Sequence, residues 1–145
     1  MKKLKIFFAD LVHNRHIYNY GVPLNIGYVA VSTKEKFDEA VEISLFKFPD
    51  LLIEALKKEP DILALSNYDW NVNLNRAIIS FAREINPEIF IVMGGPNIQK
   101  SRKGIGQFLL NNPDIDVYVL NDGEDGFPKL VGYILGKWPC SLREA

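Results

Sequence analysis

Apolar runs of strand length alternate with helical patterns along the whole chain, and this alternation constrains the fold more than any other feature. Strand-like apolar residues fill five short runs, at 4–9, 41–46, 61–65, 89–93 and 117–120. Apolar residues at helical spacing fill the segments between and after them, at 23–36, 50–59, 73–85, 99–110 and 127–135. Repeated strand–helix units of this kind form a parallel sheet with helices on both faces. We therefore expect one α/β domain with a doubly wound, five-stranded parallel sheet.

The composition of each strand indicates the strand order. The runs at 4–9, 61–65 and 89–93 are almost wholly apolar, as strands covered on both faces must be. The run at 41–46 alternates apolar with polar residues, which is typical of an edge strand. The order 2-1-3-4-5, as in flavodoxin-like and Rossmann-like folds, meets both conditions. It places the switch point between the first and third strands, where such sheets bind ligands beyond the carboxyl ends of their strands.

Bulk composition excludes several classes of protein. The chain has 145 residues, enough for one domain with a core, and its formal net charge of −1 gives no bulk attraction to nucleic acid or to an anionic membrane. No apolar run approaches the ~20 residues that span a bilayer, and the basic N-terminus fits a first strand better than a signal peptide. The single Cys140 excludes an internal disulfide and favours a cytoplasmic location.

Small, polar or glycine residues follow three of the expected strands. Residues 66–68 (Ser-Asn-Tyr) follow the third strand, 94–96 (Gly-Gly-Pro) the fourth and 121–124 (Asn-Asp-Gly-Glu) the fifth. Glycines allow the close approach of a ligand, and the polar side chains can form hydrogen bonds to it. Each segment also has a purely structural explanation. Residues 94–96 can form a tight turn, and the polar side chains at 66–67 can cap the loop or helix that follows. The carboxylates after the fifth strand can satisfy the dipole of a helix that begins at 127.

The loop at 11–21 is longer than a usual connection between a strand and a helix, and long loops in compact domains are often functional. It carries both histidines of the chain, His13 and His16. No third ligand lies next to them in the sequence, so we expect no metal site formed by side chains of this chain.

The motifs of several related folds are absent. No G-x-G-x-x-G follows the first strand, and no P-loop lysine pattern occurs. A receiver domain of a response regulator would need an acidic pair near the first strand and a lysine after the fifth, where the chain has Asp10 alone and Asn121. A flavodoxin would need a phosphate loop rich in Ser, Thr and Gly after the first strand, which residues 10–15 do not provide. A receiver-like or flavodoxin-like domain stays a third possibility.

Four segments carry longer sequence patterns. Residues 23–30 read P-L-N-I-G-Y-V-A, 60–66 read P-D-I-L-A-L-S, 86–96 begin N-P and end M-G-G-P, and 114–130 read D-I-D-V-Y-V-L-N-D-G-E-D-G-F-P-K-L. In order and spacing they resemble the P-L-x-L-G-Y-L-A, P-D-(apolar)-S, N-P…G-G-P and D-(apolar)-V…G-E-G-E-x-x-F-x-x-L motifs of one family. This family is the cobalamin-binding domain that precedes the catalytic barrel in radical S-adenosylmethionine enzymes. The resemblance covers almost the whole chain.

Two departures from the family pattern bear on the cofactor. Asn121 replaces the first glycine of G-E-G-E, and asparagine can adopt the same left-handed backbone. The D-x-H-x-x-G motif of cobalamin mutases and methionine synthase is absent, because Asp10 and His13 are separated by one residue too many and no glycine follows in the right place. We therefore expect cobalamin to bind in a base-off form without histidine ligation.

The resemblance implies a corrinoid-binding module. The nucleotide tail of the cofactor is expected to enter between the first and third strands, with the corrin ring across the loop tips. The cofactor-binding residues that it implies are Tyr20, Gly21, Ser66, Asn67, Tyr68, Gly94, Gly95, Pro96, Gly123 and Glu124. It implies no catalytic residue in this chain.

The resemblance also implies a longer polypeptide. The cobalamin-binding domain is expected over residues 1–138, and 139–145 would begin a linker, because the C-x-x-x-C-x-x-C motif of the family lies nowhere in this chain. A downstream radical S-adenosylmethionine barrel would hold the iron–sulfur cluster and S-adenosylmethionine and catalyse methyl transfer, whereas this chain alone would be no enzyme. A rival interpretation is a cofactor-free domain of the same fold that serves as a scaffold or substrate-docking platform. Asn121 and the bulky loop at 68–70 keep that interpretation open.

Overall fold

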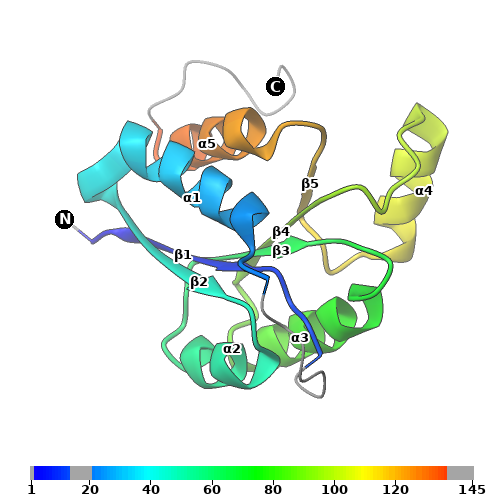
Figure 1. Cartoon of the computed structure of the whole chain (residues 1–145), viewed down its shortest axis with the longest axis horizontal. Coiled ribbons are helices and arrows are strands. Elements are labelled where there is room, and N and C mark those ends of the chain that lie inside the picture. The colour runs from blue at the N-terminus through cyan, green and yellow to red at the C-terminus, as the bar shows by residue number, and fades with distance from the viewer. Residues whose placement is uncertain (1, 14–20, 137–145) are drawn as a thin grey trace.

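The computed structural model describes residues 2–13 and 21–136, which form a parallel sheet between two layers of helices (Figure 1). The strands are β1 (Leu4–Ala9), β2 (Val41–Phe46), β3 (Ile62–Ser66), β4 (Phe90–Gly94) and β5 (Val117–Val119). They lie in the order β2-β1-β3-β4-β5, so the predicted strand order is confirmed. The order reverses between β1 and β3, and the carboxyl ends of these two strands therefore lie at the switch point.

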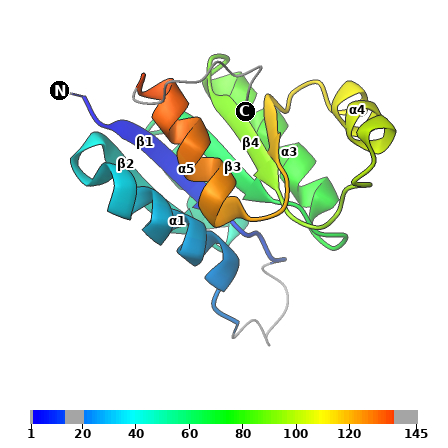
Figure 2. The same cartoon turned by 90° about the horizontal axis from the view of Figure 1, so that it is seen from above.

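Helices cover both faces of the sheet. They are α1 (Leu24–Phe37), α2 (Pro49–Leu56), α3 (Val72–Ile85), α4 (Arg102–Asn111) and α5 (Gly123–Ile134), with a short 3-10 turn, η1 (Asp38–Ala40), after α1. Helices α1 and α5 lie side by side on one face, and α2 and α3 lie on the other (Figures 1 and 2). None of the helices in the described ranges has the length and apolar character to cross a bilayer.

Each face of the sheet has its own apolar core, because successive residues of a strand point to opposite faces. Ile6 and Phe8 of β1 belong to the core under α1 and α5, whereas Phe7 belongs to the core under α2 and α3. Strand β3 is buried along its whole length, while β2 at the edge is only partly buried. The apolar and alternating runs of the sequence therefore predicted the central and edge strands correctly.

The register of the three central strands places a small residue between two larger ones. Phe8 of β1 pairs with Ala64 of β3, and Ala64 pairs in turn with Val92 of β4. All three side chains belong to the core under α1 and α5. Because the alanine side chain is short, the surface of the sheet has a depression at this point, on the face that α1 and α5 cover.

Helix α5 begins at Gly123, so the predicted start at 127 is wrong by one turn. Pro128 consequently lies inside the helix, where it cannot donate the backbone hydrogen bond that the carbonyl group of Glu124 would otherwise receive. The hydroxyl group of Ser32 on α1 donates to that carbonyl oxygen instead, at 2.7 Å. This bond joins α1 to α5, and the early start brings the Glu124 carboxylate into the first turn, where the helix dipole favours negative charge.

Candidate functional site

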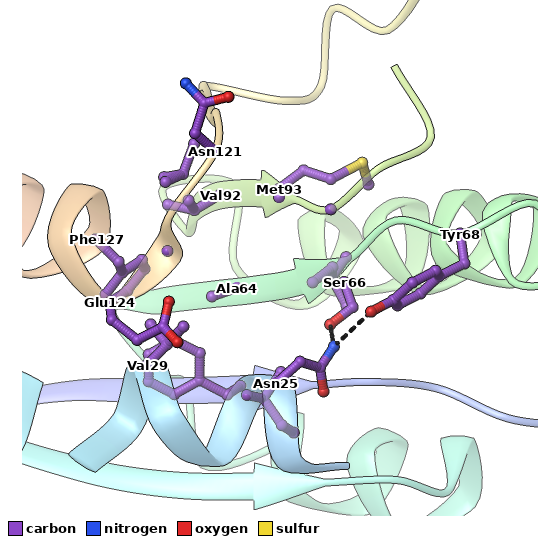
Figure 3. Close-up of a pocket in the computed structure, with 17 residues that line it drawn as sticks. Asn25, Val29, Ala64, Ser66, Tyr68, Val92, Met93, Asn121, Glu124 and Phe127 are labelled. Atoms are coloured by element: carbon purple, nitrogen blue, oxygen red, sulfur yellow. Dashed lines mark hydrogen bonds between the residues drawn. The ribbon is translucent and has the colours of Figure 1, made fainter. Parts of the chain in front are cut away.

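A cavity of about 240 Å³ opens at the carboxyl ends of β3 and β4, on the face of the sheet that α1 and α5 cover (Figure 3). The sheet forms its floor, and the first turns of the two helices form its sides. Its volume is below the ~300–1,000 Å³ of pockets that enclose a whole drug-sized ligand. The cavity therefore suits one part of a larger molecule, such as a planar ring.

Two small residues shape this cavity. Ala64 lowers the floor between Phe8 and Val92. Gly123 lets the first turn of α5 approach α1 closely, because a Cβ atom at this position would lie 2.9 Å from Cγ2 of Val29. The apolar side chains of the wall come from the sheet and from both helices, and they include Phe8, Ile26, Val29, Ala64, Val92, Val119 and Phe127.

One corner of the cavity is polar. Nδ2 of Asn25 donates to Oγ of Ser66 at 2.9 Å and to the hydroxyl oxygen of Tyr68 at 3.1 Å (Figure 3). Oδ1 of Asn25 is buried and has no hydrogen-bond partner among the described residues. The amide thus holds the two hydroxyl groups in place, and each of them keeps its own proton for donation to a ligand.

A carboxyl group lies behind this corner, at the end of β1. Burial raises the pKa of Asp10 above its ordinary value, and a hydrogen bond with Asn25 and the positive charge of Lys47 offset part of this rise. Asp10 thus lies at the switch point that the strand order predicts, but it is not among the residues that line the cavity.

The mouth of the cavity is lined by Asn121 and Glu124, which are both exposed. Asn121 has a φ of 59°, the left-handed conformation that asparagine can adopt in place of glycine. Its Oδ1 accepts a hydrogen bond from Nζ of Lys100 at 3.4 Å. The carboxylate of Glu124 projects toward the cavity (Figure 3), so the mouth offers acceptors to the hydroxyl groups of a ligand.

An aromatic pair lies beside the polar corner. The rings of Tyr68 and Trp70 stack with their centroids 4.4 Å apart and their planes 9° from parallel. Trp70 is 60% exposed. His13 lies in the segment that follows β1. Its Nε2 donates to the backbone carbonyl of Trp70 at 3.2 Å, so this segment contacts the loop that carries the aromatic pair. The carboxyl edge thus presents a flat aromatic surface next to the cavity.

The structure brings six of the ten sequence-predicted site residues together around the cavity, namely Ser66, Tyr68, Gly94, Gly95, Gly123 and Glu124. Gly21, Asn67 and Pro96 do not line it. Tyr20 lies outside the described residues, as does His16.

Asn67 and Gly95 together hold the turns after β3 and β4. Asn67 is fully buried, and its Nδ2 donates to the carbonyl oxygen of Asn97 at 3.0 Å and to the hydroxyl oxygen of Tyr118 at 3.3 Å. Gly95 has a φ of 120°, and a Cβ atom there would lie 2.6 Å from the backbone oxygen of Asn67. Glycine at 95 is therefore required by the contact between the two turns.

Sequence reasoning did not select Asn25, Val29 or Ala64 as site residues. Asn25 carried a weak signal, since it is a polar residue in the first turn of α1 directly before the buried Ile26. Ala64 carried none, because alanine in an apolar strand is ordinary and its effect depends on which residues pair with it.

Side-chain metal ligands do not gather in the part of the chain that the structure describes. Among residues 2–13 and 21–136, no group of three or more His, Cys, Asp and Glu side chains has the proximity to hold a metal ion.

The sequence of this chain matches a known family along most of its length. The model of the B12 binding domain matches residues 11–131. The chain belongs to the B12-binding domain family. This family is the one that the four sequence motifs indicated.

Relatives of the B12-binding domain occur in larger proteins. The cobalamin-dependent radical SAM methyltransferase TokK of Streptomyces tokunonensis is 33% identical over 142 residues, which are 93% of this chain and 19% of TokK. The 2-(S-pantetheinyl)-carbapenam-3-carboxylate methyltransferase of Streptantibioticus cattleyicolor is 30% identical over 104 residues, 68% of this chain and 15% of that protein. The chain thus spans less than a fifth of the length of either relative.

A solved structure supports the fold. A cobalamin-binding protein from Desulfitobacterium hafniense DCB-2 superposes with a TM-score of 0.64 at 14% identity, over 91% of this chain and 59% of that one. At this identity the likeness concerns the fold alone.

The residues of the cavity fit part of a cobalamin molecule. Its apolar walls suit an aromatic base, the hydroxyl groups of Ser66 and Tyr68 can donate to a ring nitrogen, and Glu124 can accept from a ribose hydroxyl group. A side chain at Gly123 would meet Val29 and narrow the mouth. The lining residues are therefore compatible with the chemistry of a nucleotide tail.

Proposed function

We propose that this B12-binding domain holds cobalamin with the nucleotide tail of the cofactor in the cavity between α1 and α5. The observation that carries this proposal is the cavity itself, which lies at the carboxyl ends of β3 and β4 in a domain of the B12-binding family. Its position beside the switch point is where open parallel sheets bind their ligands.

Each group around the cavity has a role in this proposal. The apolar walls exclude water from the base at the end of the tail, which is favourable by roughly 25 cal/mol for each Å² of apolar surface removed from water. Asn25 orients the hydroxyl groups of Ser66 and Tyr68 toward the base. Glu124 accepts from the ribose, in the way that acidic residues bind ribose in dinucleotide folds.

The corrin ring would lie against the loop tips, over the stacked rings of Tyr68 and Trp70. We propose that no histidine ligates the cobalt and that the cofactor is base-off. Two observations support this proposal. Nε2 of His13 already donates to the Trp70 carbonyl, and the sequence lacks the D-x-H-x-x-G spacing.

The native protein, we propose, is a radical S-adenosylmethionine methyltransferase in which this chain is the cobalamin module. The names of the two relatives and the small share of their length that the chain spans support this proposal. Bound cobalamin supplies a cobalt centre that can carry a methyl group, while the residues of this chain bind and orient the cofactor. We expect a C-x-x-x-C-x-x-C motif within about one domain length, ~100 residues, after Ala145.

The test is calorimetric titration of the 145-residue chain with hydroxocobalamin, beside the variant Ala64→Leu. Leucine at 64 fills the hollow between Phe8 and Val92, so the variant should bind at least tenfold more weakly, about 1.4 kcal/mol. The control Val31→Leu enlarges an apolar side chain at an exposed position of α1 and should bind like the wild type.

A folded wild-type chain that binds no cobalamin at millimolar concentration would contradict the proposal and favour the cofactor-free scaffold. Circular dichroism melting of Ala64→Leu checks that the variant keeps its fold. Equal affinity of a folded Ala64→Leu variant and the wild type would show that the tail lies elsewhere.

A further inference from the structure

The inner part of the cavity is apolar on three sides. Ala64 and Val92 form its floor, Val29 projects from α1, and Phe127 projects from α5 (Figure 3). Ala64, Val92 and Phe127 are each less than a tenth exposed. A ring that enters this space therefore loses its contact with water on its faces and at its far edge.

The hydrogen-bonding side chains in the inner part of the cavity are few and gather in one corner, away from Asn121 and Glu124 at the mouth. Nδ2 of Asn25 is already bonded to Ser66 and Tyr68, which leaves the two hydroxyl protons as donors. Oδ1 of Asn25 points away from Ser66 and Ala64 (Figure 3), so it does not face the apolar floor. The carboxylate of Glu124 belongs to the exposed mouth.

Corrinoids differ in the base at the end of their nucleotide tail. A benzimidazole presents a fused carbocycle and one free ring nitrogen, which is a hydrogen-bond acceptor. A purine presents further ring nitrogens and an exocyclic amine or carbonyl group. A polar group that loses water without gaining a partner weakens binding.

We propose that this cavity selects corrinoids with a benzimidazole lower base over corrinoids with a purine lower base. The inference rests on the proposed function, because it requires the tail to enter the cavity. The single ring nitrogen of a benzimidazole meets the hydroxyl groups of Ser66 or Tyr68, and its carbocycle meets Ala64 and Val92. The additional polar groups of a purine meet the same apolar floor without partners.

The experiment compares three ligands on the 145-residue chain by calorimetry: hydroxocobalamin, its analogue with adenine as the lower base, and cobinamide, which has no nucleotide. Hydroxocobalamin should bind at least tenfold more tightly than the adenine analogue, about 1.4 kcal/mol. Cobinamide should bind more weakly than hydroxocobalamin, because it places nothing in the cavity.

The outcomes separate this inference from the proposed function. Binding of the adenine analogue that equals or exceeds that of hydroxocobalamin overturns the selectivity and leaves cobalamin binding intact. Equal binding of all three ligands overturns the selectivity and also the placement of the tail. A lack of binding by any of the three overturns the proposed function itself.

A variant tests the physical cause of the selectivity. Val92→Thr keeps the shape of the side chain and adds a hydroxyl group to the floor, so the preference for hydroxocobalamin should fall at least threefold. Val119→Thr, at a less buried wall position, makes the same test if Val92→Thr does not fold. The control Val31→Thr, on the exposed side of α1, should leave the preference unchanged, and an unchanged preference in a folded Val92→Thr or Val119→Thr would contradict the inference.

Discussion

The side-chain amide of Asn25, in the first turn of α1, donates to Oγ of Ser66, the last residue of β3, at 2.9 Å. The same amide donates to the hydroxyl oxygen of Tyr68. One side chain thus fixes two hydroxyl groups that face the cavity. Asn25 positions the polar corner, and the hydroxyl groups make the contact with a ligand.

Replacement of Asn25 should weaken cofactor binding more than it weakens the fold. Asn25→Leu removes the hydrogen bonds to Ser66 and Tyr68, each worth about 1 kcal/mol, and the hydrogen bond with Asp10, but it also removes a buried Oδ1 that has no partner among the described residues. We expect the unfolding free energy to fall by no more than about 1 kcal/mol. Hydroxocobalamin affinity should fall about fivefold to tenfold, up to ~1.4 kcal/mol.

Asn111→Leu is the matched control, because Asn111 is exposed on α4 and does not line the cavity. Calorimetry gives the affinities, and urea unfolding gives the stabilities. The positioning role of Asn25 is wrong if the two leucine variants bind the cofactor equally well.

Asp10 should make the stability of the domain dependent on pH. Burial raises the pKa of this carboxyl above its ordinary value of 3.8, so the folded state binds the proton more tightly than the unfolded chain does. Protonated Asp10 therefore stabilises the folded state relative to the unfolded chain. This stabilisation is complete below pH 3.8 and is lost as the pH rises through the higher folded pKa. Asp10→Asn should therefore be more stable than the wild type at pH 7, and the difference should shrink toward pH 4.

Thermal melting at both pH values measures this effect. Asp69→Asn, in the exposed loop after β3, serves as the control for the loss of one negative charge. An Asp10→Asn variant that melts below the wild type at pH 7 would show that the attraction of Lys47 outweighs the burial of the carboxyl group.

Gly95 should be a stability determinant. Gly95→Ala introduces a Cβ atom 2.6 Å from the backbone oxygen of Asn67, at a φ of 120°. Strain of this kind costs about 1–3 kcal/mol, so the melting temperature should fall clearly. Gly21→Ala is the matched control, because a Cβ atom at Gly21 meets no atom within 4 Å. Equal melting temperatures of the two variants would refute the structural role of Gly95.

The fold could be predicted from the sequence because it depends on patterns that are local. An almost wholly apolar run at 61–65 indicates cover on both faces, and the alternating run at 41–46 suits an edge, which together favour the strand order that the structure has. The start of α5 could not be predicted in this way. Pro128 lies inside that helix, and the missing donor to the Glu124 carbonyl comes from Ser32, which is 92 residues before Glu124 in the chain.

The site could be predicted only in part, for a related reason. The turns after β3, β4 and β5 are visible in the sequence because small and polar residues end apolar runs. The hollow over Ala64 depends on register, since it exists only because Phe8 and Val92 are its partners. A shift of one residue would turn Ala64 to the opposite face of the sheet. The buried role of Asn67 likewise depends on Asn97 and Tyr118, which no local pattern relates to it.

The position of the nucleotide tail is tested most directly by methyl nuclear magnetic resonance of the 145-residue chain during titration with hydroxocobalamin. The aromatic base should shift the methyl signals of Ala64 and Val92, which form the floor of the cavity. The methyl signals of Val31, which is 57% exposed on the outer side of α1, should stay unchanged. Saturable binding that leaves the signals of Ala64 and Val92 in place would contradict a tail in the cavity between α1 and α5.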